Sequence, residues 1–257
     1  MPDDPRNPSE MHYEESFCVR SYEIDAATRA RVRTLTNYLQ EVAGRHAALL
    51  GASLEHLQSE NRTWMLVRLH LEMVAWPRWR DRICIETWPS GAESVVATRD
   101  FEIYDAAGEK IGVATSAWMV VDMRRRRAVR LPQAILDLPR CRRSRALVDE
   151  FRKLPAIDTP DLALHFELRR SEVDLNLHAN QSAYVDWAVN AVPEMTWRTR
   201  HLTGLEIAFL AEARQDDRVR SEMQDAGEGV FLHRLVRERD GRELARMRTR
   251  WEDGTPG

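Results

Sequence analysis

Hydrophobic residues in the first half of the chain recur with the period of a helix and then with that of strands. A helical period runs over residues 34–50 and ends at Gly51, after which Ser53 is placed to cap a short second helix. A strand is expected before this helix, over residues 17–24. The positions that carry the helical period are Leu35, Leu39, Val42, His46 and Leu49.

Apolar runs after the short helix predict an antiparallel meander of strands. Turns are expected at residues 89–91 and at the D-A-A-G segment 105–108, because glycine lets the chain reverse. The expected strands are 64–76, 82–88, 95–104 and 110–121.

The same pattern begins again near residue 162. Residues 166–174 repeat the hydrophobic layout of residues 17–25, and the helix around Tyr184 corresponds to the helix around Tyr38. Because the matches keep their order, we interpret the chain as a duplication. The alternative is two unrelated α+β halves that match by chance. Two further pairs keep the order, Asp81 with Asp217 and Trp118 with Trp251.

A long helix on an antiparallel sheet is the hot-dog arrangement, so two copies predict an α+β fold of the double hot-dog type. Residues 132–160 have weak periodicity, scattered prolines and a basic C-R-R-S-R cluster, which is typical of a linker. The predicted parts are a disordered tail over 1–11, a first repeat over 12–131, the linker over 132–160 and a second repeat over 161–257.

Polar residues on alternate positions precede the helix of the second repeat. An extended segment would send these alternate side chains to one face. Asn180 stands where the helix begins, and the free N–H groups of a helix start carry roughly half a positive charge. An acid, an amide and an imidazole at such a place suit the polarisation of a carbonyl group. The residues are Asp174, Asn176, His178 and Asn180.

The first repeat lacks this chemistry. It reads A-A-T-R-A-R-V where the second repeat reads L-N-L-H-A-N, and it has Trp76 where the second has Glu212. We therefore expect the polar site once, and a first repeat that is free to bind something apolar. Two structural roles remain open. Asp174 could only cap the turn that follows it, and Glu212 could only form a salt bridge with Arg214 or Arg218.

Composition narrows the function classes. A net charge of −3 argues against a protein that binds nucleic acid. The longest apolar runs fall far short of the roughly 20 residues that cross a bilayer, and the first residues do not read as a signal peptide. Cys18, Cys84 and Cys141 are odd in number and widely spaced, which predicts reduced thiols in the cytoplasm.

The pattern D-x-N-x-H-x-N, followed by a helix with Y-x-x-W, resembles the acyl-ACP thioesterases, the fatty acyl carrier protein hydrolases of plants and bacteria. The resemblance extends from about residue 12 to 252. It includes W-M-L-V-R-L-H-L-E-M, R-I-C-I-E-T-W-P-S-G and the segment A-T-S-A-W-M-V-V-D-M-R-R-R-R-A-V-R-L-P. It implies a double hot-dog homodimer without metal or organic cofactor. It also implies a catalytic set of Asp174, Asn176, His178 and Glu212.

The chain departs from the plant members of this family. Their glutamate is followed by a cysteine, whereas Ala213 follows Glu212 here. A cysteine–histidine mechanism is therefore excluded, and water or a carboxylate has to attack. A plastid transit peptide and a hydrophobic membrane anchor are also not recognised, which predicts a cytoplasmic, bacterial form.

Further residues are candidates for substrate binding. Asn180, Trp64 and Trp76 are predicted to contact the substrate, although the two tryptophans could instead belong to the core. The run Arg124, Arg125, Arg126 and Arg127 is predicted to dock an acidic acyl carrier protein. A solvated strand end is the ordinary interpretation of such a run. Other arginines compete for the docking role, namely Arg140, Arg142, Arg143 and Arg145.

The resemblance predicts hydrolysis of fatty acyl-ACP to a free fatty acid and the carrier thiol, which ends chain elongation. Glu212 or Asp174 would act as general base, Asn176 would orient water or the carbonyl, and His178 would donate a proton. A backbone N–H at the start of the following helix would help to bind the oxyanion. The rival functions are an acyl-CoA thioesterase, a hot-dog hydratase or dehydratase, and a non-catalytic acyl-binding protein.

Overall fold

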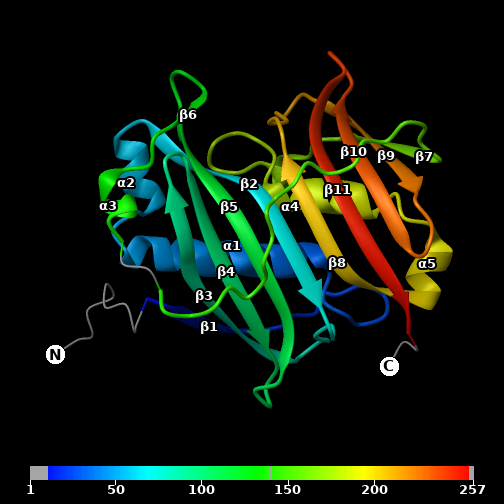
Figure 1. Ribbon diagram of the computed structural model, residues 1–257. Helices are drawn as coiled ribbons and strands as arrows, with labels where there is room; N and C mark the ends of the chain where they lie inside the picture. Colours follow the sequence, from blue (N-terminus) through cyan, green and yellow to red (C-terminus); the bar gives the residue numbers. More distant parts are fainter. Residues whose placement is uncertain (1–10, 139–140, 255–257) are drawn as a thin grey trace. The chain divides into compact units, whose positions relative to one another are not determined.

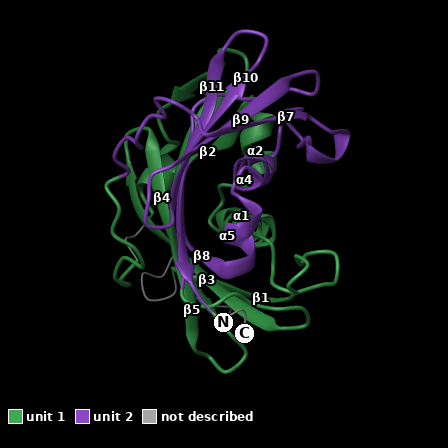
Figure 2. Ribbon diagram, turned by 90° about the vertical axis from the view of Figure 1, so that its right-hand side faces the viewer, with its two compact units in different colours: residues 1–67, 74–150 green, residues 68–73, 151–257 purple. Residues whose placement is uncertain are grey.

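The structure is a computed structural model that describes residues 11–138 and 141–254. The chain divides into two compact units, and Figure 2 colours each of them. The first unit takes its described residues from the ranges 1–67 and 74–150, and the second consists of 68–73 with 151–257. Within the described ranges, every helix is too short or too polar to cross a membrane.

The first unit is a long helix on an antiparallel sheet (Figure 1). Its strands pair in the order β1–β3–β4–β5, with β6 beside β5. Helix α1 packs against β1 and β3, and it buries Leu35, Leu39 and Val42. The elements are β1 (Tyr13–Cys18), α1 (Val32–Leu49), α2 (Leu54–Ser59), β2 (Arg62–Met73), β3 (Arg82–Glu93), β4 (Val96–Tyr104), β5 (Lys110–Asp122), β6 (Arg127–Val129) and α3 (Gln133–Leu136).

The second unit repeats this plan. Residues 68–72 of β2 pair with β8, and the sheet continues as β8–β11–β10–β9–β7, antiparallel throughout. Helix α4 packs against β9 and β10. The elements are β7 (Leu162–Glu167), η1 (Arg170–Glu172), α4 (Gln181–Val189), α5 (Glu194–Thr199), β8 (Arg200–Phe209), β9 (Arg218–Asp225), β10 (Val230–Arg237) and β11 (Arg242–Asp253). Both units are therefore hot-dog folds, as the sequence predicts.

The two units correspond at a constant spacing near their N-terminal ends. Strand β7 and helix α4 each begin 149 residues after β1 and α1 (13 to 162, and 32 to 181). At the same spacing, Phe17 stacks on Tyr38 with ring centroids 4.2 Å apart, and Phe166 stacks on Trp187 at 6.4 Å.

This spacing corrects the sequence match between the two helices. Tyr38 corresponds to Trp187, and Tyr184 corresponds to Leu35. The match of Tyr38 with Tyr184 is wrong by three residues. A slip of three residues moves a helix by nearly one turn and leaves its apolar face in place, so periodicity could not detect it.

Two predicted strand boundaries are also wrong. Strand β1 ends at Cys18, and residues 19–25 form turns rather than the end of a strand. Strand β3 runs through the turn expected at 89–91 and continues to Glu93, with a shift of register between Pro89 and Gly91. Proline cannot donate to a strand ladder, so an irregularity in the pairing lets the strand continue past it.

The segments predicted as a disordered tail and a linker differ in part from these predictions. Residues 1–10 of the predicted tail lie outside the described residues, whereas Met11 is fully buried. In the segment 132–160, α3 is an additional short helix. Further along, Arg145 Nε and the backbone N–H of Ala146 bind the buried carboxylate of Asp100 at 2.7 and 2.9 Å, which fastens this segment to the first unit.

Candidate active site

The segment that precedes α4 is a tight turn and not an extended strand. Oδ1 of Asp174 accepts the backbone N–H groups of Asn176 and His178 at 2.8 and 3.2 Å. The Asp174 N–H in turn donates to the His178 carbonyl at 2.8 Å, and Leu177 has a φ of 60°. An aspartate side chain that replaces a backbone acceptor is typical of such turns. The prediction that alternation places the polar side chains on one face is therefore wrong in its geometry.

The first unit contains the same turn. Oδ1 of Asp25 accepts the N–H groups of Ala27 and Arg29 at 2.9 Å each, and the Asp25 N–H donates to the Arg29 carbonyl at 2.8 Å. Thr28 has a φ of 64°, which matches Leu177. The aspartate is thus required by the turn in both units, whereas only the second unit places a histidine at its end.

The turn brings His178 to Glu212. Residues His178 and Arg214 form an antiparallel bridge, and the Ala179 N–H donates to the Ala213 carbonyl at 2.9 Å. As a result, Nε2 of His178 lies 3.3 Å from Oε2 of Glu212. The side chains are 19% and 35% exposed, so the pair is shielded but reachable by a substrate. An imidazole and a carboxylate at this distance can exchange or share a proton.

The structural alternative for Glu212 was a salt bridge with Arg214 or Arg218. Arg218 instead reaches Glu167, at 2.9 Å from Nη2 to Oε1. The Arg214 backbone N–H binds the buried carboxylate of Asp217 at 2.8 Å. The ion pair of Glu212 is instead with His178.

Asn180 begins helix α4, as predicted. Its Oδ1 accepts both the N–H and the hydroxyl of Ser182 at 2.9 Å, which caps the helix. The Asn180 N–H donates to the Glu172 carbonyl at 2.7 Å. Asn180, which was predicted to contact the substrate, therefore uses its amide oxygen for the cap. Asn176 lies half-buried on the turn between Asp174 and His178.

Tyr184 is a further residue of this region, and the sequence pattern did not indicate a role for it. Its hydroxyl bonds the backbone beside Glu212. The hydroxyl accepts the N–H of Ala213 at 2.7 Å and donates to the carbonyl of Ala211 at 3.2 Å. The Y-x-x-W pattern contains this tyrosine, but nothing in the spacing shows where its hydroxyl ends.

The arginines predicted to dock a carrier protein differ in their exposure and in their partners. Arg124 to Arg126 are exposed on the turn between β5 and β6, and Arg127 is exposed at the start of β6. Asp122 Oδ1 accepts the N–H groups of Arg124 and Arg125. Arg145 binds Asp100, as described above. Arg143 pairs with Glu86 and lies 4.9 Å from the centre of the Trp88 ring. Arg142 is exposed, and Arg140 lies outside the described residues.

The two tryptophans predicted to contact substrate are both half-buried. Trp64 donates its Nε1–H to the Ala52 carbonyl at 2.9 Å. Its ring packs on a buried apolar cluster, so this residue belongs to the core of the first unit. Trp76 holds the position that Glu212 has in the second unit. The cluster under Trp64 consists of Ala52, Leu57, Val120, Leu131 and Ile135.

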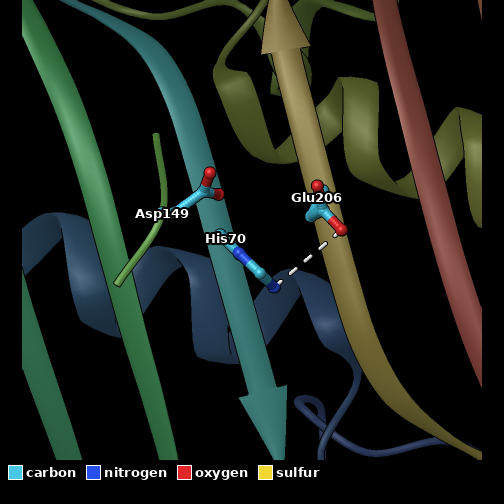
Figure 3. A group of neighbouring side chains, drawn as sticks. All are labelled: His70, Asp149 and Glu206. Carbon is cyan, nitrogen blue, oxygen red and sulfur yellow. Dashed lines mark ion pairs between the residues drawn. The ribbon is translucent and has the colours of Figure 1, made fainter. Parts of the chain in front are cut away.

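The second unit holds another imidazole–carboxylate pair, which serves as a contrast. Figure 3 shows His70 on β2 and Glu206 on β8, with Nε2 and Oε1 4.0 Å apart. Oε1 of Glu206 also accepts Nε–H of Arg248 at 3.0 Å. His70 and Glu206 lie on paired strands of the sheet. His178 instead lies at the turn before α4, and Glu212 lies on the segment between β8 and β9.

Comparison with solved structures identifies the class of fold. An acyl-ACP thioesterase from Bacteroides thetaiotaomicron superposes with a TM-score of 0.86 over 96% of this chain and all of its own, at 23% identity. The 12:0-ACP thioesterase from Umbellularia californica superposes equally well, over 95% of this chain and 98% of its own, at 24% identity. These likenesses confirm the double hot-dog fold.

Comparison of sequences identifies the family. The model described as acyl-ACP thioesterase N-terminal domain matches residues 10–138, and the model for the C-terminal domain matches residues 157–253. Oleoyl-acyl carrier protein thioesterase 2 of Arabidopsis thaliana is 29% identical over 93% of this chain and 76% of its own length. The chain therefore belongs to the acyl-ACP thioesterase family, whose members are thioester hydrolases.

Proposed function

We propose that this protein hydrolyses the thioester of fatty acyl-acyl carrier protein, releases the free fatty acid and so ends chain elongation. The observation that carries the proposal is the His178–Glu212 pair, at 3.3 Å, in the unit whose sequence matches the family's C-terminal domain. The corresponding positions of the first unit are Arg29 and Trp76, which cannot perform the same acid–base chemistry.

In the proposed mechanism, water is the nucleophile and Glu212 is the general base. The Glu212 carboxylate takes a proton from water while the water oxygen forms a bond to the thioester carbon. His178 stabilises the oxyanion and then donates a proton to sulfur as the carbon–sulfur bond breaks. The products are a carboxylic acid and a thiol. Transfer of a proton from Glu212 to His178 then restores both side chains to their starting protonation states. General acid–base catalysis of this kind contributes about 10²–10⁴ in rate.

Asp174 is the alternative base, but its hydrogen bonds favour a structural role. Its Oδ1 already accepts two backbone N–H groups, as Asp25 does in the unit without the pair. We therefore assign Asp174 to shaping the turn and Asn176 to orienting the water or the carbonyl. At the start of α4, the N–H groups of Asn180 and Ser182 already have acceptors, so we assign stabilisation of the oxyanion to His178.

We propose that the first unit, residues 12–131 of the predicted division, binds the acyl chain and presents Arg124 to Arg127 to the carrier protein. The exposure of all four arginines supports this role, since carrier proteins are acidic. A cytoplasmic homodimer stays the expectation from the resemblance. The free thiols of Cys18, Cys84 and Cys141 are compatible with a reducing compartment. Light scattering after gel filtration measures the oligomeric state.

A panel of thioesters tests the function. Fatty acyl-ACP and acyl-CoA of matched chain lengths are assayed for thiol release, with the wild-type protein and the His178→Ala variant. We expect faster release from acyl-ACP and a large loss in the variant. Preference for acyl-CoA would identify the rival thioesterase. Stoichiometric acyl binding without thiol release, or equal release by the variant, would contradict catalysis at this site.

A further inference from the structure

We infer that Tyr184 and Arg237 are positioning residues that fix the backbone carrying Glu212, and that they act on catalysis through this glutamate. The two peptide groups on either side of the Glu212 Cα are held. The Tyr184 hydroxyl binds the Ala211 carbonyl at 3.2 Å and the Ala213 N–H at 2.7 Å, and Arg237 Nη1 donates to the Glu212 carbonyl at 3.1 Å. We call these contacts the Glu212 brace. This inference rests on the proposed function.

The position of Glu212 in the chain explains why a brace is needed. Strand β8 ends at Phe209 and β9 begins at Arg218, so Glu212 lies outside both strands. A carboxylate that is 35% exposed on a connecting segment would otherwise sample several positions relative to His178. A displacement of about 1 Å at a reacting group can cost a factor of roughly 10² in rate.

The brace is built from buried groups. Tyr184 is 3% exposed and Arg237 is 9% exposed. Arg237 is itself held, because its Nε and Nη2 bind the carboxylate of Asp240 at 3.0 and 2.7 Å. Its Nη1 also lies 3.8 Å from the buried carboxylate of Asp217. The guanidinium thus reaches the Glu212 carbonyl from a fixed position.

A hydroxyl suits the position of Tyr184 because it donates and accepts at the same time. Burial raises the pKa of Tyr184, so the hydroxyl keeps its proton and can donate to the Ala211 carbonyl. A phenylalanine would fill the same space on α4 but would leave one buried N–H and one carbonyl without their partner.

The first unit has the same turn but no glutamate, and its described residues replace each member of the brace. Leu35 replaces Tyr184, and Pro77 replaces Ala213 and has no N–H to donate. At the spacing of 136 residues that relates Pro77 to Ala213, Cys84 corresponds to Arg220. Cys84 pairs with Tyr104 and Arg220 pairs with Val236, so the next residue, Asp105, replaces Arg237. All three members are therefore changed together with the glutamate, which is Trp76 in the first unit. The difference indicates that the brace serves Glu212 and is not required by the fold.

The first experiment compares Tyr184→Phe with Tyr38→Phe, using acyl-ACP hydrolysis. Tyr38 is the matched control, since its buried hydroxyl binds Glu23 at 2.7 Å on the helix of the first unit. We expect Tyr184→Phe to lower kcat roughly tenfold to a hundredfold with little change in KM, because only the reacting group moves. The control should keep the wild-type kcat. Equal kcat in both variants would overturn the inference.

A second variant tests the same contact from the backbone side. Ala213→Pro removes the N–H that Tyr184 accepts and copies the residue of the first unit. Its loss of kcat should not exceed that of Tyr184→Phe, which removes two hydrogen bonds. The double variant should be no worse than Tyr184→Phe, because Ala213→Pro removes a hydrogen bond that Tyr184→Phe also removes. Fully multiplied losses would contradict the brace.

A double-mutant cycle with Glu212→Gln separates positioning from a general loss of structure. If Tyr184 acts through Glu212, Tyr184→Phe causes no further loss of kcat in the Glu212→Gln background. An equal loss in both backgrounds would overturn the brace alone. A Glu212→Gln variant as active as the wild type would overturn the proposed function as well, so the two failures are distinguishable.

Discussion

The two turns that precede α1 and α4 have the same backbone conformation but end in different side chains. In both, an aspartate accepts two N–H groups and the residue three positions later has a positive φ. In the first unit the turn ends at Arg29, whose Nε binds Asp25 itself at 3.2 Å. In the second it ends at His178, which faces Glu212. The two turns thus separate what the fold requires, the aspartate, from what the proposed mechanism requires, the histidine and the glutamate.

The largest expected effect concerns the residues that differ between the turns. His178→Ala and Glu212→Gln should each lower kcat by about 10²–10⁴, because each removes a proton donor or acceptor. The measurement is thiol release from acyl-ACP at saturating substrate. Glu206→Gln is the control, since it removes the acid of another imidazole–carboxylate pair of the second unit. A comparable loss in this control would show that charge in general, and not this pair, determines the rate.

The next effect concerns the aspartate that both turns share. Asp174→Ala and Asp25→Ala should each reduce the free energy of unfolding by about 1–3 kcal/mol, because two N–H groups lose their acceptor. Urea unfolding followed by tryptophan fluorescence measures this change.

Asp174→Asn sharpens the comparison, because asparagine keeps the acceptor oxygen and removes the charge. Asp174→Asn should keep the free energy of unfolding of the wild type. If Asp174 only shapes the turn, kcat should stay within about tenfold of the wild type, a much smaller loss than removal of a general base would cause. A loss of kcat equal to that of Glu212→Gln would make Asp174 the base and contradict the division of roles.

A smaller effect concerns acid stability of the first unit. Burial, together with Arg99 whose Nη1 lies 2.9 Å from Nδ1, lowers the pKa of His46 to about 3. Below the ordinary pKa of about 6.5, the unfolded chain binds a proton that the folded chain does not, so stability falls as the pH decreases from about 6.5 to about 3.

His46→Gln should remove up to about 1.4 kcal/mol per pH unit from this dependence. Urea midpoints between pH 7 and pH 4 provide the measurement. His165→Gln is the control, since the His165 side chain is 62% exposed. An unchanged slope in His46→Gln would show that other groups determine acid sensitivity.

The smallest effect concerns the arginines of the β5–β6 turn. Replacing Arg124 and Arg125 by glutamate should raise KM for acyl-ACP several-fold and leave KM for acyl-CoA unchanged, because an acidic carrier would lose attraction to the turn. Added salt should reduce the difference between variant and wild type. A parallel rise with both substrates would contradict carrier docking.

Much of this protein could be predicted from residue patterns. Helix α1, the cap of α2 by Ser53 and the strands β4 and β5 agree with the predictions within a few residues, because burial on one face imposes a period on the sequence. The order of matched segments also predicted the repeated hot-dog fold, which the comparisons confirm.

The sequence by itself determined which residue types are available at the turns, and so which unit carries an imidazole and an acid. It could not determine that residues 174–178 form a turn, since alternation describes a strand equally well. Only the tertiary structure determined that His178 lies beside Glu212 and that the Tyr184 hydroxyl bonds the peptide groups next to Glu212. The reason is physical. Periodicity reports which side of an element is buried, whereas a contact between residues far apart in the chain depends on how separate elements pack.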